Sequence, residues 1–171
     1  QDSLQRNFSF LPIKENLIDS IWKNRPKKII STPFKYHKIF HGEDKLIKIK
    51  KILNHINRNK VDAYVSTSCD SICWLFNIRA QDLEYSPLLM ARSIIHKNGD
   101  CFIFSDQKSL KDEIVSGKIR IIYKSLKHFN NHFKENKDLV NSYLCAPNEI
   151  SYNSFQSIKK ISGRVVFKDN I

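Results

Sequence analysis

The sequence predicts an α/β fold, in which a layered, mixed and mostly parallel sheet carries helices on both faces. Short apolar runs alternate with longer segments whose apolar residues recur every three or four positions, as strands alternating with helices do. Such alternation produces right-handed crossovers between parallel strands. The pair Asn98-Gly99 lies between two apolar runs. It predicts one antiparallel hairpin, because both residues tolerate positive φ.

The length and composition bound the class of protein. The chain has 171 residues, which favours one domain, since domains commonly run ~100–200 residues. It is 41% hydrophobic and 27% charged, which is typical of a soluble globular protein. No apolar run reaches the ~18 residues of a membrane span, and the N-terminus lacks a signal-peptide pattern. Because the chain begins at Gln1 and its one methionine is Met90, we expect a piece of a longer protein.

The net charge of +12 has two explanations. An excess of lysine and arginine can mark a surface that binds nucleic acid, and a basic nucleic-acid-binding module is therefore the alternative function. A binding surface, however, requires clustered charges. The lysines are scattered along the whole chain, which favours solvated faces instead.

The cysteines lie in apolar contexts typical of strands or helices: Cys69, Cys73, Cys101 and Cys145. No histidine or second cysteine pair stands at zinc-finger spacing. We therefore expect free, buried thiols in a reducing, cytoplasmic environment.

The first half of the chain leads up to one long helix. Residues 1–15 are expected to be a linker or lead-in segment, and residues 16–171 a single domain. A short helix at 17–22 should end before Pro26, because the residue before proline avoids the helical region. Residues 27–42 are expected to form an extended connector that wraps over the domain.

The long helix is predicted at residues 43–58, with lysines on the face opposite its apolar stripe. That stripe consists of Leu46, Ile49, Leu53 and Ile56, widened by Ile47 and Ile52. A strand at 61–67 follows and leads into a short helix that carries Trp74 and is capped by Ser68 or Asp70. A polar loop ends this helix.

The remaining elements alternate regularly. Strands are expected at 88–96, 101–104, 118–123, 139–145 and 165–167, and helices at 108–115, 125–135 and 149–161.

Catalytic motifs are missing from the sequence. Its four glycines are isolated, which excludes a P-loop or a dinucleotide fingerprint, and no Gly-x-Ser-x-Gly is present. His128 and His132 lie one helical turn apart, but the glutamate of a zinc peptidase motif is not beside them. Asp62, Asp70 and Asp106 lie near strand ends, yet their spacing does not bring them together. On its residues alone, the chain is expected to be non-catalytic and to bind no metal.

Two runs of the chain resemble a known family. The first is Asn16-x-x-Asp19-x-x-Trp22-x-x-Arg25-Pro26, with Gly42-Glu43-Asp44-Lys45 at the start of the long helix. The second is Asp70-x-Ile72-x-Trp74-Leu75-x-Asn77-Ile78-Arg79-x-x-Asp82, followed by Tyr85-x-Pro87. In order and spacing they resemble the middle domain of the three-domain Xaa-Pro aminopeptidases (aminopeptidase P) across residues 16–105. The sequence departs from the family at Cys73 for Ala, Ala80 for Gly and Ser86 for Asn. Ala80 matters most, because a β-carbon disfavours positive φ.

The resemblance implies a creatinase/prolidase N-terminal-type domain with ribonuclease-H-like architecture. The parent would be a hydrolase, a metallopeptidase that removes the N-terminal residue before proline with two manganese ions. Those ions belong to a separate C-terminal pita-bread domain, whose metal-binding motifs match nothing here, so this fragment alone is expected to be inactive. Its partners would be its own catalytic domain, proline-containing peptides and further copies of the enzyme, with no membrane or nucleic acid.

The candidates for a substrate-channel wall lie in one corner: Trp74, Asn77, Arg79 and Asp82. Arg79 offers a planar fork for carbonyl or carboxylate groups, and Trp74 an apolar face suited to a proline ring. The structural alternative is that Trp74 is core and that Arg79 pairs with Asp82. Trp22 and Arg25 are candidates for contacts between domains, with a satisfied helix end as the alternative.

Overall fold

The computed structural model describes residues 11, 13, 15–27, 30–107 and 114–168. The helices are α1 (Leu17–Ile21), α2 (Lys38–His41), α3 (Lys45–Arg58), α4 (Cys69–Phe76), α5 (Phe129–Glu135) and α6 (Tyr152–Lys159), with a 3₁₀ turn, η1 (Leu126–His128). The large sheet contains β2 (Ala63–Ser66), β4 (Ala91–His96), β5 (Asp100–Ser105), β6 (Ile114–Ser116), β7 (Ile119–Lys124), β8 (Ser142–Cys145) and β9 (Arg164–Phe167). A small sheet pairs β1 (Phe34–Lys35) with β3 (Ile78–Arg79).

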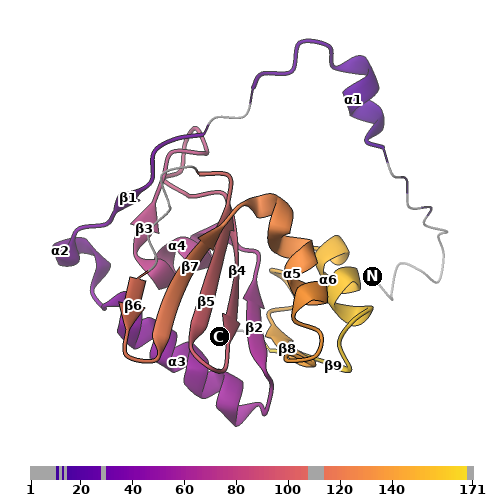
Figure 1. The fold of residues 1–171 in the computed structure, drawn as a ribbon. Helices are drawn as coiled ribbons and strands as arrows, with labels where there is room; N and C mark the ends of the chain where they lie inside the picture. Colours follow the sequence, from indigo (N-terminus) through magenta and orange to yellow (C-terminus); the bar gives the residue numbers. More distant parts are fainter. Residues whose placement is uncertain (1–10, 12, 14, 28–29, 108–113, 169–171) are drawn as a thin grey trace.

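The strands of the large sheet follow the order β6-β7-β5-β4-β2-β8-β9 (Figure 1). Parallel pairs join β2 to β8, β8 to β9 and β5 to β7, whereas β2–β4, β4–β5 and β6–β7 are antiparallel. In the described part of the chain, β2, β5, β7, β8 and β9 therefore run in one direction, with β4 and β6 reversed. The predicted mixed, mostly parallel α/β sheet is confirmed.

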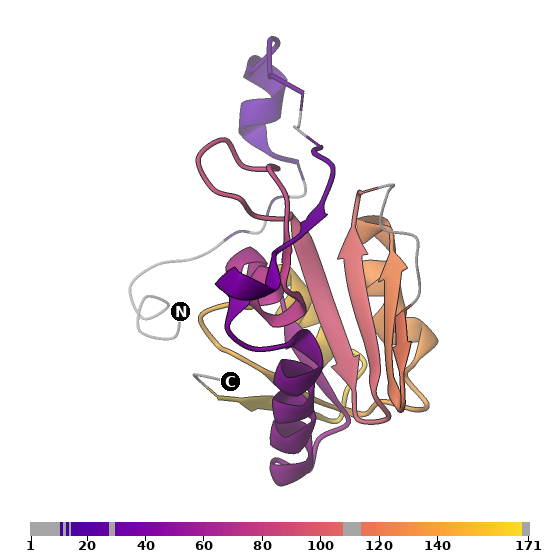
Figure 2. The ribbon, with the colours of Figure 1, turned by 90° about the vertical axis from the view of Figure 1, so that its left-hand side faces the viewer.

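Helices cover both faces of this sheet, as Figure 2 shows from the side. The alternation of strand side chains explains the two cores. On β2, Tyr64 packs in a cluster with residues of α3 and α4, whereas Ala63 and Val65 pack in the cluster that holds α5 and α6. Because β2 and β5 are buried on both sides, apolar residues follow one another in them without a break, over residues 63–65 and 101–104.

Local sequence signals explain most element ends. Asp44 caps α3 by accepting a hydrogen bond from the backbone N–H of Leu46 at 2.8 Å. Gly99 turns β4 into β5 with a φ of 100°, as the Asn-Gly pair predicts. A β-carbon there would lie 2.1 Å from the carbonyl oxygen of Lys118, so glycine is required by space as well as by φ.

Three regions differ from the sequence prediction or extend it. The predicted helix at 108–115 is wrong at its end, because residues 114–116 form β6, a second antiparallel hairpin with β7. Residues 108–113 lie outside the described residues, as does most of the segment 1–15. The connector 27–42 also contains β1 and α2, which the sequence did not predict. Ala80 is fully buried without a positive φ, so its β-carbon is accommodated.

Within the described residues, none of the helices has the length and apolar character needed to cross a bilayer.

A pair of buried histidines joins α5 to the sheet. Nε2 of His132 on α5 lies 3.0 Å from Nε2 of His96 on β4, and both rings pack against Phe102. The sequence spacing pairs His132 with His128 instead, but His128 is exposed. A hydrogen bond between two ring nitrogens needs one bare nitrogen, which two protonated rings cannot supply. Burial lowers the pKa of His96 to about 4 and, with the neighbouring His96 and Lys124, the pKa of His132 to about 3.

The loop between β3 and β4 is held by one buried carboxylate, that of Asp82, which is 8% exposed. Its Oδ1 accepts hydrogen bonds from the backbone N–H and the hydroxyl of Ser31, at 3.0 and 3.1 Å, and from Nε2 of Gln107 at 2.7 Å. Its Oδ2 accepts one from the backbone N–H of Met90 at 2.9 Å. Asp82 therefore joins the connector, the loop and the end of β5.

We expect the free energy of unfolding to fall as the pH drops below about 6.5, the ordinary histidine pKa. Both histidines have lowered pKa values, so the unfolded chain binds protons that the folded pair does not. Urea unfolding should show a loss of about 4 kcal/mol between pH 7 and pH 5, with each histidine contributing roughly half. His132→Leu should flatten this slope, and His128→Leu at the exposed site is the matched control. An unchanged slope in His132→Leu contradicts the assignment.

Asp82→Asn should lower the free energy of unfolding by about 2–3 kcal/mol. The new amide NH₂ is a donor, and it replaces a carboxylate oxygen that accepted hydrogen bonds, so two donors then face each other. Urea unfolding at neutral pH measures this loss. Glu84→Gln, an exposed acid in the same loop, is the control and should stay within about 0.5 kcal/mol of the parent chain. A loss from Asp82→Asn as small as that of the control shows that the loop is held by other contacts.

Candidate functional site

The predicted corner forms where α4 ends. Leu75 and Phe76 are buried against the sheet and fix the helix. The helix stops at Asn77, whose φ of 52° and ψ of 42° are left-handed. Among non-glycine residues, asparagine adopts this conformation most readily. The chain then enters β3, where Arg79 pairs with Phe34 of β1.

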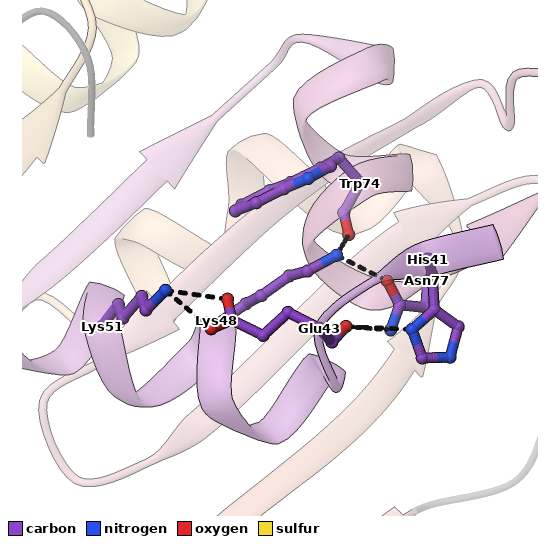
Figure 3. Close-up of polar contacts among 6 residues, drawn as sticks. All are labelled: His41, Glu43, Lys48, Lys51, Trp74 and Asn77. Carbon is purple, nitrogen blue, oxygen red and sulfur yellow. Dashed lines mark hydrogen bonds and ion pairs between the residues drawn. The ribbon is translucent and has the colours of Figure 1, made fainter. Parts of the chain in front are cut away.

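A buried lysine lies inside this corner. Lys48 of α3 is 2% exposed, and its ammonium donates to the carbonyl oxygen of Trp74 and to Oδ1 of Asn77, each at 2.7 Å (Figure 3). The same Nζ lies 4.2 Å from the centroid of the Trp74 ring. The prediction that the lysines of this helix face solvent is wrong at Lys48. The signal was present, because Lys48 lies one turn before Ile52, on the apolar stripe itself.

The acids near Lys48 are engaged elsewhere. Both carboxylate oxygens of Glu43 bind Lys51, at 2.7 and 2.9 Å, and the carboxylate of Asp44 caps α3. The backbone carbonyl of Glu43 accepts from Nδ2 of Asn77 at 3.0 Å, which joins the start of α3 to the end of α4. Burial lowers the pKa of Lys48. Because these acids are engaged elsewhere, the two hydrogen-bond acceptors of the Lys48 ammonium are uncharged. The aromatic ring of Trp74 adds a cation–π attraction to these two hydrogen bonds.

The Trp74 ring is not part of the core. It is 51% exposed, so the alternative of a buried indole is wrong. Nη1 of Arg79 donates to the carbonyls of Cys73 and Ile78, at 2.6 and 2.9 Å, and its guanidinium carbon lies 4.7 Å from the Tyr36 ring centroid. Among the described residues it forms no ion pair with Asp82, so that alternative is wrong too.

An open hollow of about 490 Å³ borders this corner. Its lining combines apolar groups with one carboxylate, two hydroxyl-bearing side chains and one guanidinium: Ile52, Trp74, Leu75, Leu88, Asp70, Tyr64, Ser71 and Arg79. A hydrogen bond from Ser68 lowers the pKa of Asp70, which keeps the carboxylate charged. The hollow can thus contact an apolar side chain, an amine and a carbonyl or carboxylate.

The structure separates the four predicted channel residues into two places. Trp74 and Asn77 meet around Lys48, and Arg79 adjoins them through the carbonyl of Cys73. Asp82 instead holds the loop through its contacts with Ser31, Met90 and Gln107.

The candidates for contacts between domains lie apart from the body, around α1 (Figure 1). Arg25 forms an ion pair with Asp19 at 2.5 Å, and its guanidinium carbon lies 5.2 Å from the Trp22 ring centroid. Asn16 caps the helix by accepting a hydrogen bond from the backbone N–H of Ile18 at 3.0 Å. All residues of α1 are exposed, so in the part of the chain that the structure describes the printed contacts of this helix are local.

The described residues contain no group of three or more side chains that could bind a metal ion. Asp62 and Asp70 lie at opposite ends of β2, and Asp62 is bonded to Lys97 and Ser142. These acids therefore do not form a nuclease-like cluster with each other.

Comparison with known proteins identifies the family. A family model for the creatinase/prolidase N-terminal domain matches residues 24–170. A probable Xaa-Pro aminopeptidase P of Coprinopsis cinerea is 31% identical over 103 residues, and aminopeptidase P1 of Lotus japonicus is 28% identical over 102. Each alignment covers 60% of this chain but only 16% and 15% of those proteins.

A solved structure shares the fold. The X-prolyl aminopeptidase of Caenorhabditis elegans, described as a cytosolic enzyme with a di-nuclear active site, matches with a TM-score of 0.74 at 19% identity. The match covers 90% of this chain and 26% of that one. The resemblance seen in the sequence is confirmed. Since the family model spans most of its length, the chain belongs to the creatinase/prolidase N-terminal domain family.

Proposed function

We propose that this chain is a non-catalytic domain of an Xaa-Pro aminopeptidase, an enzyme that removes the N-terminal residue before proline. In this proposal the α4 corner walls part of the substrate channel, and α1 contacts another part of the enzyme. Peptide hydrolysis, with its two manganese ions, belongs to a separate catalytic domain. The enzyme works in the cytoplasm as a homo-oligomer.

The observation that carries the proposal is the position of Trp74. The residues around it on α4 are buried, whereas its large ring stays half-exposed beside an open hollow. Exposing an aromatic ring to water costs free energy, which contact with a partner recovers. A proline ring, being apolar and rigid, suits such a face.

Arg79 supports the same use of the corner. Only Nη1 donates to the backbone carbonyls, so Nε and Nη2 have no hydrogen-bond partner among the described residues. Because Tyr36 and those carbonyls hold the guanidinium in place, its remaining donors are preorganised. They suit the carbonyl or carboxylate oxygens of a peptide.

The α1 segment supports contact with the rest of the enzyme. An isolated helix of five residues is not stable in water, and within the described residues none of the side chains of α1 is buried. Its large apolar side chains are all exposed: Leu17, Ile18, Ile21 and Trp22. The chain spans 16% of a curated relative, which leaves room for a further domain that covers this face.

Arg79→Ala in the full-length enzyme should lower kcat/KM for Xaa-Pro peptides by ~10-fold or more, because a contact made in the transition state is lost. Steady-state hydrolysis of a series of Xaa-Pro peptides measures the change. Arg58→Ala, an exposed arginine at the end of α3, is the matched control. A rate for Arg79→Ala that stays within about twofold removes Arg79 from the mechanism.

Trp22→Ala should change the free energy of unfolding of this 171-residue chain by less than about 0.5 kcal/mol, because α1 packs on nothing within its described residues. In the full-length enzyme the same change should cost about 2 kcal/mol, the loss of an aromatic anchor. Urea unfolding of both proteins measures this, with Lys23→Ala as control. Equal effects in the two proteins contradict a docking role.

A further inference from the structure

We propose that Lys48 is a positioning residue that holds the Trp74 ring as a platform for the peptide. This inference rests on the proposed function of the corner. It adds a residue outside the runs that carry the family resemblance, because Lys48 lies beyond Lys45 on α3, whereas Trp74 belongs to the run on α4.

The Lys48 ammonium has three contacts: two hydrogen bonds and one aromatic ring. Two of its hydrogens go to the carbonyl of Trp74 and the amide oxygen of Asn77. The aromatic ring lies 4.2 Å away, within the range of a cation–π interaction. Glu43 and Asp44 have other partners, so no carboxylate among the described residues forms an ion pair with the Lys48 ammonium.

The same contacts of Lys48 hold both the backbone and the ring of Trp74. The backbone of Trp74 is fixed through its carbonyl, and one face of its ring is covered by the ammonium. Figure 3 shows the ring lying over the Lys48 side chain. The ammonium covers one ring face, and the ring also lines the hollow, so the orientation that Lys48 gives the ring sets the part of it that a ligand can contact.

A lysine that only caps α4 would need no such stacking. Hydrogen bonds from a neutral donor satisfy the carbonyls at a helix end equally well. The charge is useful when the orientation of the ring matters, because the cation–π attraction is strongest over the face of an indole and out of water. The two roles therefore differ in whether the charge or only the donors are needed.

Three substitutions separate these roles. Lys48→Gln keeps donor groups and loses the charge, Lys48→Met loses both, and Lys48→Arg keeps both. Lys50→Met, on the exposed face of the same helix, is the matched control. Acrylamide quenching is measured on the chain with Trp22→Phe, in which Trp74 is the one remaining tryptophan. The circular dichroism melt of each variant verifies folding.

We expect Lys48→Gln and Lys48→Met to make Trp74 more accessible to acrylamide, whereas Lys48→Arg and Lys50→Met leave its quenching unchanged. In the full-length enzyme, Lys48→Gln should raise KM for Xaa-Pro peptides roughly fivefold, the loss of one cation–π contact, with little change in kcat. Trp74→Leu combined with Lys48→Gln should be no worse than Trp74→Leu alone, because Lys48 acts through the ring.

The failures are distinguishable. If a folded Lys48→Gln variant shows the quenching of the parent chain, Lys48 is a helix cap and the positioning role is overturned. If quenching rises but KM does not change, Trp74 is held by Lys48 without meeting the peptide, which overturns the platform and the proposed function of the corner. If the double variant is worse than Trp74→Leu, Lys48 does not act through Trp74.

Discussion

A lysine charge kept away from water is the constraint on which the α4 corner depends. Burying an ammonium without a carboxylate is costly unless its hydrogens meet fixed acceptors. The end of α4 supplies the carbonyl of Trp74, which also accepts a longer hydrogen bond from the backbone N–H of Asn77, at 3.4 Å. The left-handed turn at Asn77 brings a second oxygen beside it. These acceptors lie at the end of α4 and the donor lies on α3. If the two helices slid or separated, the buried ammonium would lose its hydrogen-bond acceptors. The path into β3, and with it Arg79, follows from that turn.

Local patterns predicted most of the fold because they act over a few residues. The period of the apolar residues predicted α3, and Asn98-Gly99 predicted the β4–β5 hairpin. The misses involve partners that are distant in sequence. His132 pairs with His96 on another element, not with His128 one turn away. Residues 114–116 form a strand because β7 offers an edge to them, which no local propensity reveals.

The candidate site shows the same limit. Trp74, Asn77, Arg79 and Asp82 stand close together in the sequence, but a helix end and a tight turn send their side chains in different directions. The motif alone therefore does not separate a residue that faces the hollow from Asp82, which holds a loop. Lys48 was missed for the opposite reason. A charged residue on an apolar stripe was assigned to solvent by its type, although its position on the helix indicated the interior.

The neighbours of β2 also bear on how the chain assembles. Ala63 pairs on one side with His96 and on the other with Tyr143, which lies much farther along the sequence. Because closing a longer loop costs more entropy, we expect β2 to pair with β4 before it pairs with β8. The segment between those two strands contains α4 and β3. During synthesis, the tryptophan-bearing corner can thus take shape while the ribosome is still making β8.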